Sequence, residues 1–432
     1  MEIAAEPLAD LAPLVARICD DAVNQHNRRC VGHQVSAPTT PSLLADLLVA
    51  TLNNGMASYE SGPVSSALER NVTRWLAARL GMPEGADGVL TSGGTLGNLT
   101  ALLAARQLCL ADFTNANQGA NQGDSRDAAS DKLCVVASEH AHYCVERAAA
   151  VMGFGDGGVV RAAVDAELRL RGEAVREAVA RARDAGRRVV AVVATAGASP
   201  SGAFDPLEEL ASTCAKLGVW LHVDAAHGAS AAMSRRYRSL LAGIERADSV
   251  VWDAHKLLSM PALVTAVLFR RGDVSYAPFA HDADYLFEPG GPPARWYDYG
   301  VRNMECTKRM LSVQLYLTLA ATGTDAIDAY VTGRFDLARR FGELIAQASD
   351  FELVAAPRCN IVCFRYSGGD GGDEDAGLQD RLRRRVIEGG RFYLTRTTIA
   401  KRAALRVTLM NPRTTERDLI ELLDSLRTAA AR

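Results

Sequence analysis

Two stretches, Leu221-His-Val-Asp-Ala-Ala-His-Gly228 and Ser249-Val-Val-Trp-Asp-Ala-His-Lys-Leu257, decide the fold of this chain. Each begins as an apolar, β-branched run that predicts a short buried strand, and each ends in polar residues. The first places Asp224 at a strand end, and the second places Lys256 there. Because the carboxyl ends of parallel strands meet at the edge of an α/β sheet where ligands bind, we expect the two side chains to lie close together.

Short apolar runs alternate with helical stretches between about residues 88 and 271. This alternation predicts an α/β fold with a mostly parallel sheet covered by helices on both faces. The expected strands are Leu133–Ala137, Val189–Ala194, Val219–Val223, Ser249–Trp252 and Leu263–Phe269, and the expected helices are Ser42–Asn53, Val64–Leu80, Leu168–Ala185 and Pro206–Leu217.

The C-terminal part predicts a second, smaller domain. A helix-rich stretch from about Met310 leads into Phe351–Ser367, Leu405–Asn411 and a final helix, a pattern typical of an α+β domain. A chain of 432 residues is also long for one core. We therefore expect an N-terminal segment (1–41), a large α/β domain (42–309) and a small C-terminal domain (310–432).

The composition is that of an ordinary globular protein, with 48% hydrophobic and 23% charged residues. A net charge of −3 with interspersed signs gives no indication of a nucleic-acid or membrane surface. The first residues lack the pattern of a signal peptide, and no apolar run is long enough to span a bilayer. Nine scattered cysteines indicate neither a disulfide framework nor a metal site, so we expect a reduced, cytoplasmic protein without a metal.

Lys256 and Asp224 suggest a specific chemistry. A lysine at a strand end can form a Schiff base with an aldehyde. A carboxylate can keep a pyridine nitrogen protonated, which makes the ring an electron sink. Together they are the minimum apparatus for pyridoxal 5'-phosphate (PLP). Taken singly, each residue has an ordinary alternative, because lysines commonly extend along surfaces and an aspartate after a strand often caps a helix.

Thr91-Ser-Gly-Gly-Thr-Leu-Gly-Asn-Leu99 is a glycine-rich turn before an apolar helix expected at Leu99–Leu110. Glycines allow close approach of a phosphate, and a helix N-terminus offers free N–H groups. Gly94 and Thr95 are therefore the expected phosphate contacts, although many such turns only cap helices.

Two further strand-end segments offer candidates. His142, in Ser138-Glu-His-Ala-His-Tyr-Cys144, could stack on a cofactor ring and assist proton transfer, but His140 lies in the same segment and the spacing does not choose between them. Ser199, in the loop Ala194–Asp205, could reach the cofactor or the substrate; its alternative is an ordinary Ser-Pro turn.

Taken together, these motifs resemble the group II PLP-dependent amino-acid decarboxylases, relatives of the glutamate, cysteine-sulfinate and aromatic amino-acid enzymes. The most specific matches are His222-Val-Asp-Ala-Ala226, Asp253-Ala-His-Lys256, Ser92-Gly-Gly-Thr95 and Ala141-His142. The resemblance implies the PLP-dependent transferase fold type I, a homodimer and α-decarboxylation of an amino acid.

The resemblance also implies roles for single residues. Lys256 corresponds to the Schiff-base lysine, Asp224 to the pyridinium partner, His142 to the stacked imidazole and Tyr285 to the loop tyrosine that protonates Cα. Further cofactor contacts are implied at Gly94, Thr95, Ser199, Ala226, Asp253 and His255.

Substrate contacts are implied at His33, Gln34, Ser36, Thr39, His227 and Arg406. His227 stands where many family members carry an aromatic residue, and the polar set favours a small polar or acidic amino acid. Two alternatives stay open at this point. One is an aldehyde-forming oxidative deaminase on the same fold, which a loop phenylalanine in place of Tyr285 would favour, and the other is a PLP-binding paralogue without catalysis.

Overall fold

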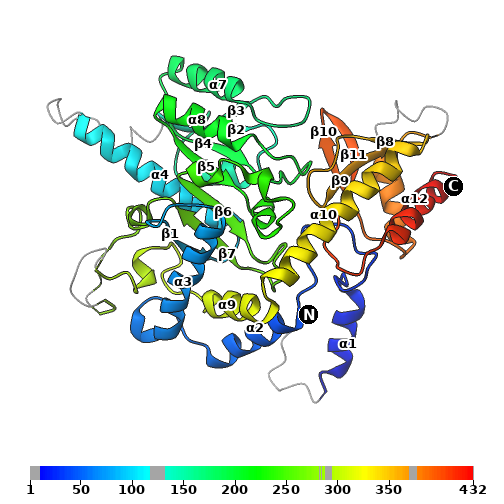
Figure 1. The fold of residues 1–432 in the computed structure, drawn as a ribbon, viewed down its shortest axis with the longest axis horizontal. Helices are drawn as coiled ribbons and strands as arrows, with labels where there is room; N and C mark the ends of the chain where they lie inside the picture. The colour runs from blue at the N-terminus through cyan, green and yellow to red at the C-terminus, as the bar shows by residue number, and fades with distance from the viewer. Residues whose placement is uncertain are drawn as a thin grey trace.

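A seven-stranded sheet forms the centre of the larger part of the molecule (Figure 1). The computed structural model describes residues 10–116, 132–281, 283, 285–287, 294–368 and 377–431. The strand order is β1-β7-β6-β5-β4-β2-β3. The strands are β1 (Asp87–Thr91), β2 (Leu133–Ser138), β3 (Val159–Ala162), β4 (Arg188–Thr195), β5 (Trp220–Asp224), β6 (Ser249–Asp253) and β7 (Thr265–Phe269).

The sheet is mostly parallel, as expected. Strands β3, β2, β4, β5 and β6 run parallel, whereas β7 lies antiparallel between β6 and β1. The reason is the short connection from β6 to β7, because a parallel crossover needs a dozen or more residues, usually with a helix. The strand residues of β2, β6 and β7 are all buried, which explains why the sequence shows continuous apolar runs there instead of alternation.

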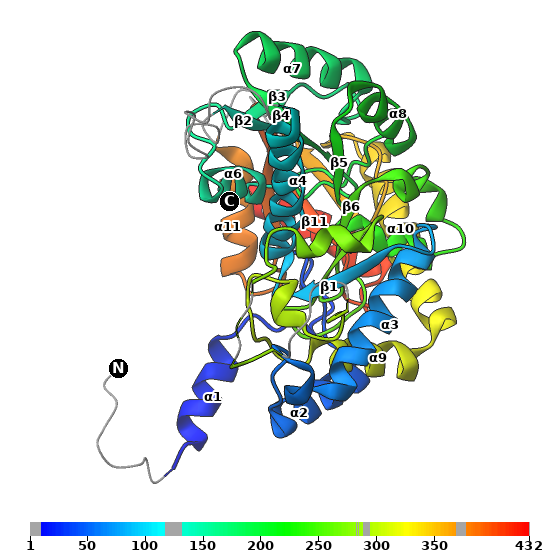
Figure 2. The same ribbon diagram turned by 90° about the vertical axis from the view of Figure 1, so that its left-hand side faces the viewer.

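Helices cover both faces of this sheet (Figure 2). Buried side chains of α4 and α6 pack on one face of β2 and β4, and those of α7 and α8 pack on the other. The helices of this part are α2 (Thr40–Leu52), α3 (Pro63–Arg79), α4 (Gly94–Ala116), α6 (Cys144–Val151), α7 (Gly172–Asp184), α8 (Leu207–Leu217) and α9 (Leu311–Thr322). Among the helices of the described ranges, none is long and apolar enough to cross a membrane.

One predicted helix begins later than expected. The stretch from Leu168 is helical only from Gly172. The preceding residues form a tight turn in which the Asp165 carboxylate accepts hydrogen bonds from the backbone N–H groups of Glu167 and Arg169. Leu168 has a φ of 65°, which a right-handed helix excludes. Apolar residues keep a helical spacing through this turn, so the sequence pattern did not indicate it.

A second, antiparallel sheet lies beside the first, with the order β10-β11-β9-β8. Its core contains residues between Ala338 and Ala429 together with Val31 from the N-terminal segment. The domain limits at residues 41/42 and 309/310 stay predictions. The elements are α10 (Thr324–Gln347), β8 (Phe351–Leu353), β9 (Ile361–Tyr366), α11 (Leu378–Glu388), β10 (Thr395–Ile399), β11 (Arg402–Thr408) and α12 (Glu416–Ala430), and the isolated helix α1 (Ala12–Asp21) precedes them all.

A buried ion pair fixes the end of β1. Lys308 Nζ lies 2.5 Å from Glu69 Oε1 and donates to the carbonyl of Leu90, and both charged side chains are fully buried. The same carboxylate oxygen accepts the backbone N–H of Leu90. The pair therefore ties α3 to the strand that leads into the glycine-rich turn.

Lys308→Met is expected to destabilise the protein by about 3–5 kcal/mol, because it leaves Glu69 buried without its cationic partner. The measurement is the urea midpoint followed by circular dichroism. The matched control is Arg309→Met, which removes an exposed ion pair with Asp46 and should cost at most about 1 kcal/mol. Equal shifts in the two variants would contradict the assignment.

Candidate active site

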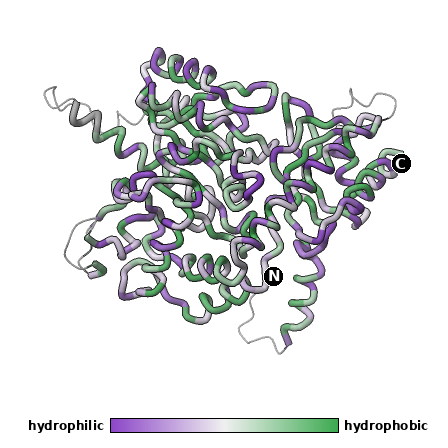
Figure 3. Tube along the Cα trace, viewed as in Figure 1, coloured by the Kyte–Doolittle hydropathy of each residue, from purple (hydrophilic) through white to green (hydrophobic). Residues whose placement is uncertain are grey.

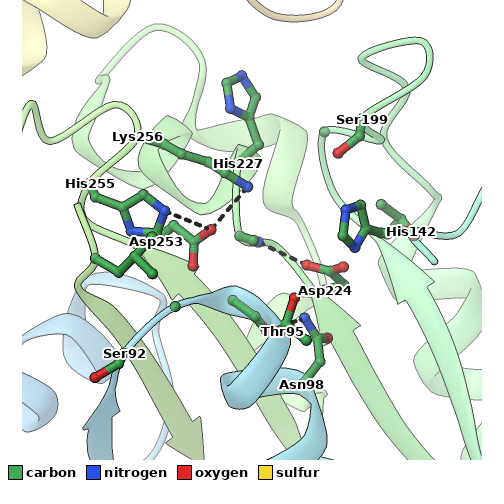
Figure 4. Close-up of a pocket in the computed structure, with 16 residues that line it drawn as sticks. Ser92, Thr95, Asn98, His142, Ser199, Asp224, His227, Asp253, His255 and Lys256 are labelled. Carbon is green, nitrogen blue, oxygen red and sulfur yellow. Dashed lines mark hydrogen bonds and ion pairs between the residues drawn. The ribbon is translucent and has the colours of Figure 1, made fainter. Parts of the chain in front are cut away.

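One cavity gathers the polar residues at the strand ends (Figure 4). It lies at the carboxyl ends of β4, β5 and β6, where an open α/β sheet places its ligands. Its lining includes ten residues proposed from the sequence: Gly94, Thr95, His142, Ser199, Asp224, Ala226, His227, Asp253, His255 and Lys256.

Adjacent strands bring Asp224 and Lys256 to this cavity. Asp224 ends β5 and pairs in register with Val251 of the neighbouring β6, and Lys256 follows three residues after the end of β6. Asp224 is nearly buried and accepts a hydrogen bond from the backbone N–H of Ala226. The expectation that the acid and the lysine share one site is therefore met in the geometry.

Asp253 holds the lysine amine. Lys256 Nζ lies 3.0 Å from Asp253 Oδ2, and His255 Nε2 lies 3.6 Å from the same oxygen. Burial by itself raises the pKa of Asp253. Lys256, His255 and a 2.6 Å hydrogen bond from Thr265 outweigh this effect, so the pKa of the carboxyl lies below its usual value. The carboxylate is thus a fixed negative partner for the amine.

The glycine-rich turn is the first turn of α4. The helix begins at Gly94 and not at Leu99, which corrects the sequence-based start. Gly93 has a φ of +113°, and a Cβ added at Gly94 would lie 3.0 Å from both carboxylate oxygens of Asp253. A side chain at Gly94 would therefore crowd the Asp253 carboxylate, and the pattern Gly-Gly-Thr places the free N–H groups of the helix start on the cavity.

His142, and not His140, lines the cavity. Its Nδ1 accepts a hydrogen bond from the backbone N–H of Cys144. Burial lowers the pKa of His142, and nearby Lys256 lowers it further while Asp224 opposes the shift. The lowered pKa favours the neutral form of the imidazole.

The chain matches a known protein family over most of its length. The model of the "Pyridoxal-dependent decarboxylase conserved domain" matches residues 1–367. The chain belongs to this family. The decarboxylase is 32% identical over 386 residues to an L-2,4-diaminobutyrate decarboxylase of Rhizobium meliloti, covering 89% of this chain and 74% of the relative. It is 29% identical to an aromatic-L-amino-acid decarboxylase of Bacillus atrophaeus, covering 90% of this chain and 78% of that relative.

The fold agrees with solved structures of the same kind. The crystal structure of mouse CSAD superimposes with a TM-score of 0.88 at 26% identity, over 99% of this chain and 90% of that one. The fold type I architecture with a large mostly parallel sheet and a smaller antiparallel sheet is thus confirmed, and so are the PLP-dependent decarboxylase activity and its cofactor.

The residues of the decarboxylase fit PLP. The start of α4 at Gly94 and Thr95 lines the cavity, where its free N–H groups suit a phosphate, and a primary amine and a carboxylate stand at neighbouring strand ends. Thr195 adds a buried hydroxyl in the lining that has no hydrogen-bond partner among the described residues. An orphan hydroxyl of this kind is expected where a polar ligand group binds.

His227 is anchored from the second sheet. The ring is 2% exposed, and its Nε2 lies 2.7 Å from Asn360 Oδ1. Asn360 Nδ2 donates to the carbonyl of Leu409, so the amide oxygen faces the imidazole and His227 carries its proton on Nε2. Burial, together with Lys256, lowers the pKa of His227 to about 3. The ring is therefore neutral and offers no cation to an acidic substrate.

The other proposed substrate contacts surround the cavity without lining it. Residues 31–39 form an N-terminal strap between the two sheets: the Ser36 hydroxyl donates to the carbonyl of His255, and the backbone N–H of Thr39 donates to the carbonyl of Ser259. His33 lies 5.7 Å from the Tyr393 ring, and Gln34 has a buried amide nitrogen without a hydrogen-bond partner among the described residues. Arg406 donates to the carbonyl of Ser199, which does line the cavity.

Tyr285 is the one proposed catalytic residue that the structure does not bring to the cavity. Its side chain is 92% exposed and does not contribute to the lining. Its role as the proton donor therefore stays a prediction.

Sequence reasoning missed several residues of the lining: Asn98, Thr195, Gly197 and Leu263. Asn98 follows Gly94 by one helical turn, so a correct helix start would have indicated it. Leu263 is half-exposed in the connection between β6 and β7, where its side chain lies against Gly93. No sequence signal indicates that contact, because it depends on the path that the chain takes from β6 into the antiparallel strand β7.

Proposed function

We propose that this decarboxylase removes the α-carboxyl group of a small polar or acidic L-amino acid. The observation that carries the proposal is the Lys256 amine, held by Asp253 beside a cavity that Asp224 and His142 also line. PLP, when bound, takes up the electron pair that the departing carboxyl group leaves behind.

The side chains have distinct tasks in this proposal. Lys256 would attach the cofactor through its amine. Asp224 would keep a proton on the pyridine nitrogen, His142 would stack on the ring, and the small Ala226 would leave room for it. Gly94 and Thr95 would hold the phosphate at the start of α4, where the helix dipole favours an anion. Asp253 and His255 orient Lys256, and Ser199 borders the substrate.

The protein must also orient the substrate, since the bond to the carboxyl group has to stand perpendicular to the conjugated ring as it breaks. Arg406, through its position beside Ser199, is the proposed partner of a substrate carboxylate. His33, Gln34, Ser36, Thr39 and His227 complete the polar surroundings.

Charge around the strap supports an acidic substrate. The pKa of His33 is lowered by burial and then by the guanidinium groups of Arg406 and Arg383. If His33 borders the substrate as proposed, the two cations close to it would favour a substrate that carries a negative side chain. Sequence identity does not distinguish between substrate classes, because relatives named for diaminobutyrate and for aromatic amino acids are 32% and 29% identical to the chain.

A carbon dioxide release screen tests the substrate class. The panel contains aspartate, glutamate, cysteine sulfinate, 2,4-diaminobutyrate, tyrosine and tryptophan, each with added PLP. The expected result is the highest kcat/KM for an acidic or small polar amino acid. A preference for tyrosine or tryptophan would overturn the proposed class while leaving the decarboxylase activity intact.

We propose that Tyr285 returns a proton to Cα after carbon dioxide leaves. Because its ring lies outside the cavity, this role requires the Tyr285 side chain to reach the site during turnover. Protonation at Cα gives the amine, whereas its failure leaves the carbanion to react with oxygen.

Tyr285→Phe is expected to shift the product from amine towards aldehyde, with ammonia and hydrogen peroxide appearing together, and to lower amine formation by about 10²-fold. The measurement is the amine-to-aldehyde ratio under air, with Tyr316→Phe, a change at another exposed tyrosine, as the matched control. An unchanged amine yield would remove Tyr285 from the mechanism. Stoichiometric peroxide from the wild type would instead favour the oxidative deaminase.

We also propose a homodimer. Helix α2 packs one side on α9 but exposes a row of leucines, Leu43, Leu44, Leu47, Leu48 and Leu52. This apolar stretch runs along the outer edge of the molecule (Figure 3). Helix α1 also has no buried residue. Leu44 and Leu47 are 62% and 64% exposed, so a second copy covering this surface would remove a large apolar area from water.

Replacing Leu44 and Leu47 together by Glu is expected to convert a dimer into a monomer in sedimentation-velocity runs at micromolar concentration, because charges would have to be buried in the contact. Ile420→Glu, on the exposed side of α12, is the control and should not change the sedimentation. A dimer that survives the double change would place the interface elsewhere. We also propose a cytoplasmic location, because all nine cysteines are free and suit a reducing compartment.

A further inference from the structure

A chain of hydrogen bonds links strands β5 and β6 to helix α4 and ends at the glycine-rich turn. Trp220 Nε1 donates to Ser249 Oγ at 2.9 Å, and Ser249 Oγ lies 2.8 Å from Nδ1 of His222. Nε2 of His222 lies 2.7 Å from Asn98 Oδ1, and Asn98 Nδ2 donates to the carbonyl of Gly94 at 2.8 Å. Ser249 and His222 are fully buried and Asn98 nearly so.

The carbonyl of Gly94 sets the direction of this chain. It can only accept, so it must face the amide nitrogen of Asn98, which leaves the amide oxygen towards His222. His222 therefore carries its proton on Nε2, and its Nδ1 accepts from the hydroxyl of Ser249. Every donor in the chain then has one acceptor, and a reversed amide would set two carbonyl oxygens against each other.

The ring stays neutral in this arrangement. Burial lowers the pKa of His222 to about 4, although the nearby Asp224 acts in the opposite direction. His222 and Asp224 lie two residues apart on β5 and therefore point to the same face of the sheet. A protonated His222 would be a competing cation for Asp224, so a neutral ring leaves that carboxylate for the cofactor.

We propose that His222 is a positioning residue for the cofactor phosphate. Through Asn98 it fixes the first turn of α4, so that the N–H groups at Gly94 and Thr95 are aimed at the phosphate before the cofactor arrives. Preorganised donors of this kind bind more tightly than donors that must be ordered on binding. The inference rests on the proposed assignment of the phosphate to this turn.

The test compares PLP with pyridoxal, which has the same aldehyde and ring but no phosphate. His222→Phe keeps the ring volume and removes both hydrogen bonds. The expected result is an affinity for PLP about tenfold weaker, the order of effect of losing one buried hydrogen bond that orders the turn, with the affinity for pyridoxal unchanged. Both affinities are measured by absorbance titration of the aldehyde on the purified apoprotein, without any substrate.

Asn98→Asp is the second variant, in case His222→Phe does not fold. The carboxylate cannot donate to the carbonyl of Gly94, and its charge lies at the phosphate site, so we expect PLP affinity to fall by about 10²-fold with pyridoxal again unaffected. The matched control is Asn411→Asp, a buried amide on the far side of the second sheet that donates to the carbonyl of Gln25. It should leave the PLP-to-pyridoxal ratio at the wild-type value.

The outcomes separate two failures. If the wild type itself binds PLP and pyridoxal equally well, the phosphate does not lie at this turn and the proposed site assignment is wrong. If the wild type prefers PLP but both His222→Phe and Asn98→Asp keep that preference, the turn is correct and His222 serves only the packing of the core.

Discussion

Lys256→Ala is expected to reduce carbon dioxide release to less than about one thousandth for every amino acid in the screen, because it removes the amine that attaches the cofactor. Lys256 is the only lysine in the cavity lining formed by the described residues, so no neighbouring amine can replace it. The measurement is single-turnover carbon dioxide release together with the visible absorbance of bound PLP.

Lys256→Arg separates the amine from its charge. A guanidinium can keep the ion pair with Asp253, so the variant should fold like the wild type, but it is too weakly nucleophilic to attach the aldehyde. We expect no visible band and no turnover. A yellow, active Lys256→Arg protein would show that another residue carries the cofactor.

Asp224→Asn should lower kcat by about 10³-fold, which corresponds to ~4 kcal/mol of transition-state stabilisation. The amide keeps the shape of the side chain but has no charge with which to hold a proton on the pyridine nitrogen, and the ring then withdraws electrons poorly. The affinity for PLP should fall much less than kcat, since the phosphate contacts are elsewhere.

Asp248→Asn is the control for this change, because Asp248 precedes β6 at the opposite end of the same pair of strands, where it accepts the backbone N–H of Leu221. Its substitution should affect stability but not the rate of the chemical step. If Asp224→Asn leaves kcat within tenfold of the wild type, Asp224 is a structural cap and not the partner of the ring nitrogen.

The site was predictable where it follows from strand periodicity. The runs around Val223 and Val250 predicted two buried strands, and their pairing as neighbours places Asp224 and Lys256 on one cavity. Gly94 and Thr95 were predictable for a similar reason, since a glycine pair before an apolar helix indicates an approach that no side chain can occupy. The cofactor and the reaction then followed from residue chemistry and family resemblance.

The features that could not be predicted from the sequence depend on contacts that form only in the folded chain. The start of α4 at Gly94 was missed because glycine and threonine form helices poorly, whereas in the folded chain the first turn is helical and Asn98 Nδ2 donates to the carbonyl of Gly94. The partner of His227 is Asn360, which comes from the other sheet and is 133 residues away in sequence. No local pattern connects them. The position of Tyr285 relative to the cavity likewise depends on tertiary structure.

The N-terminal strap has a consequence for how the protein is made. Val31 donates to the carbonyl of Tyr393, its own carbonyl accepts from Thr408, and Ser36 reaches the loop of Lys256. The strap leaves the ribosome long before its partners on the second sheet, because Tyr393 and Thr408 lie far downstream of Val31 in the sequence. At ordinary synthesis rates the delay is on the order of tens of seconds. The strap can therefore take its place beside the loop of Lys256 and the second sheet only after the second sheet has been synthesised.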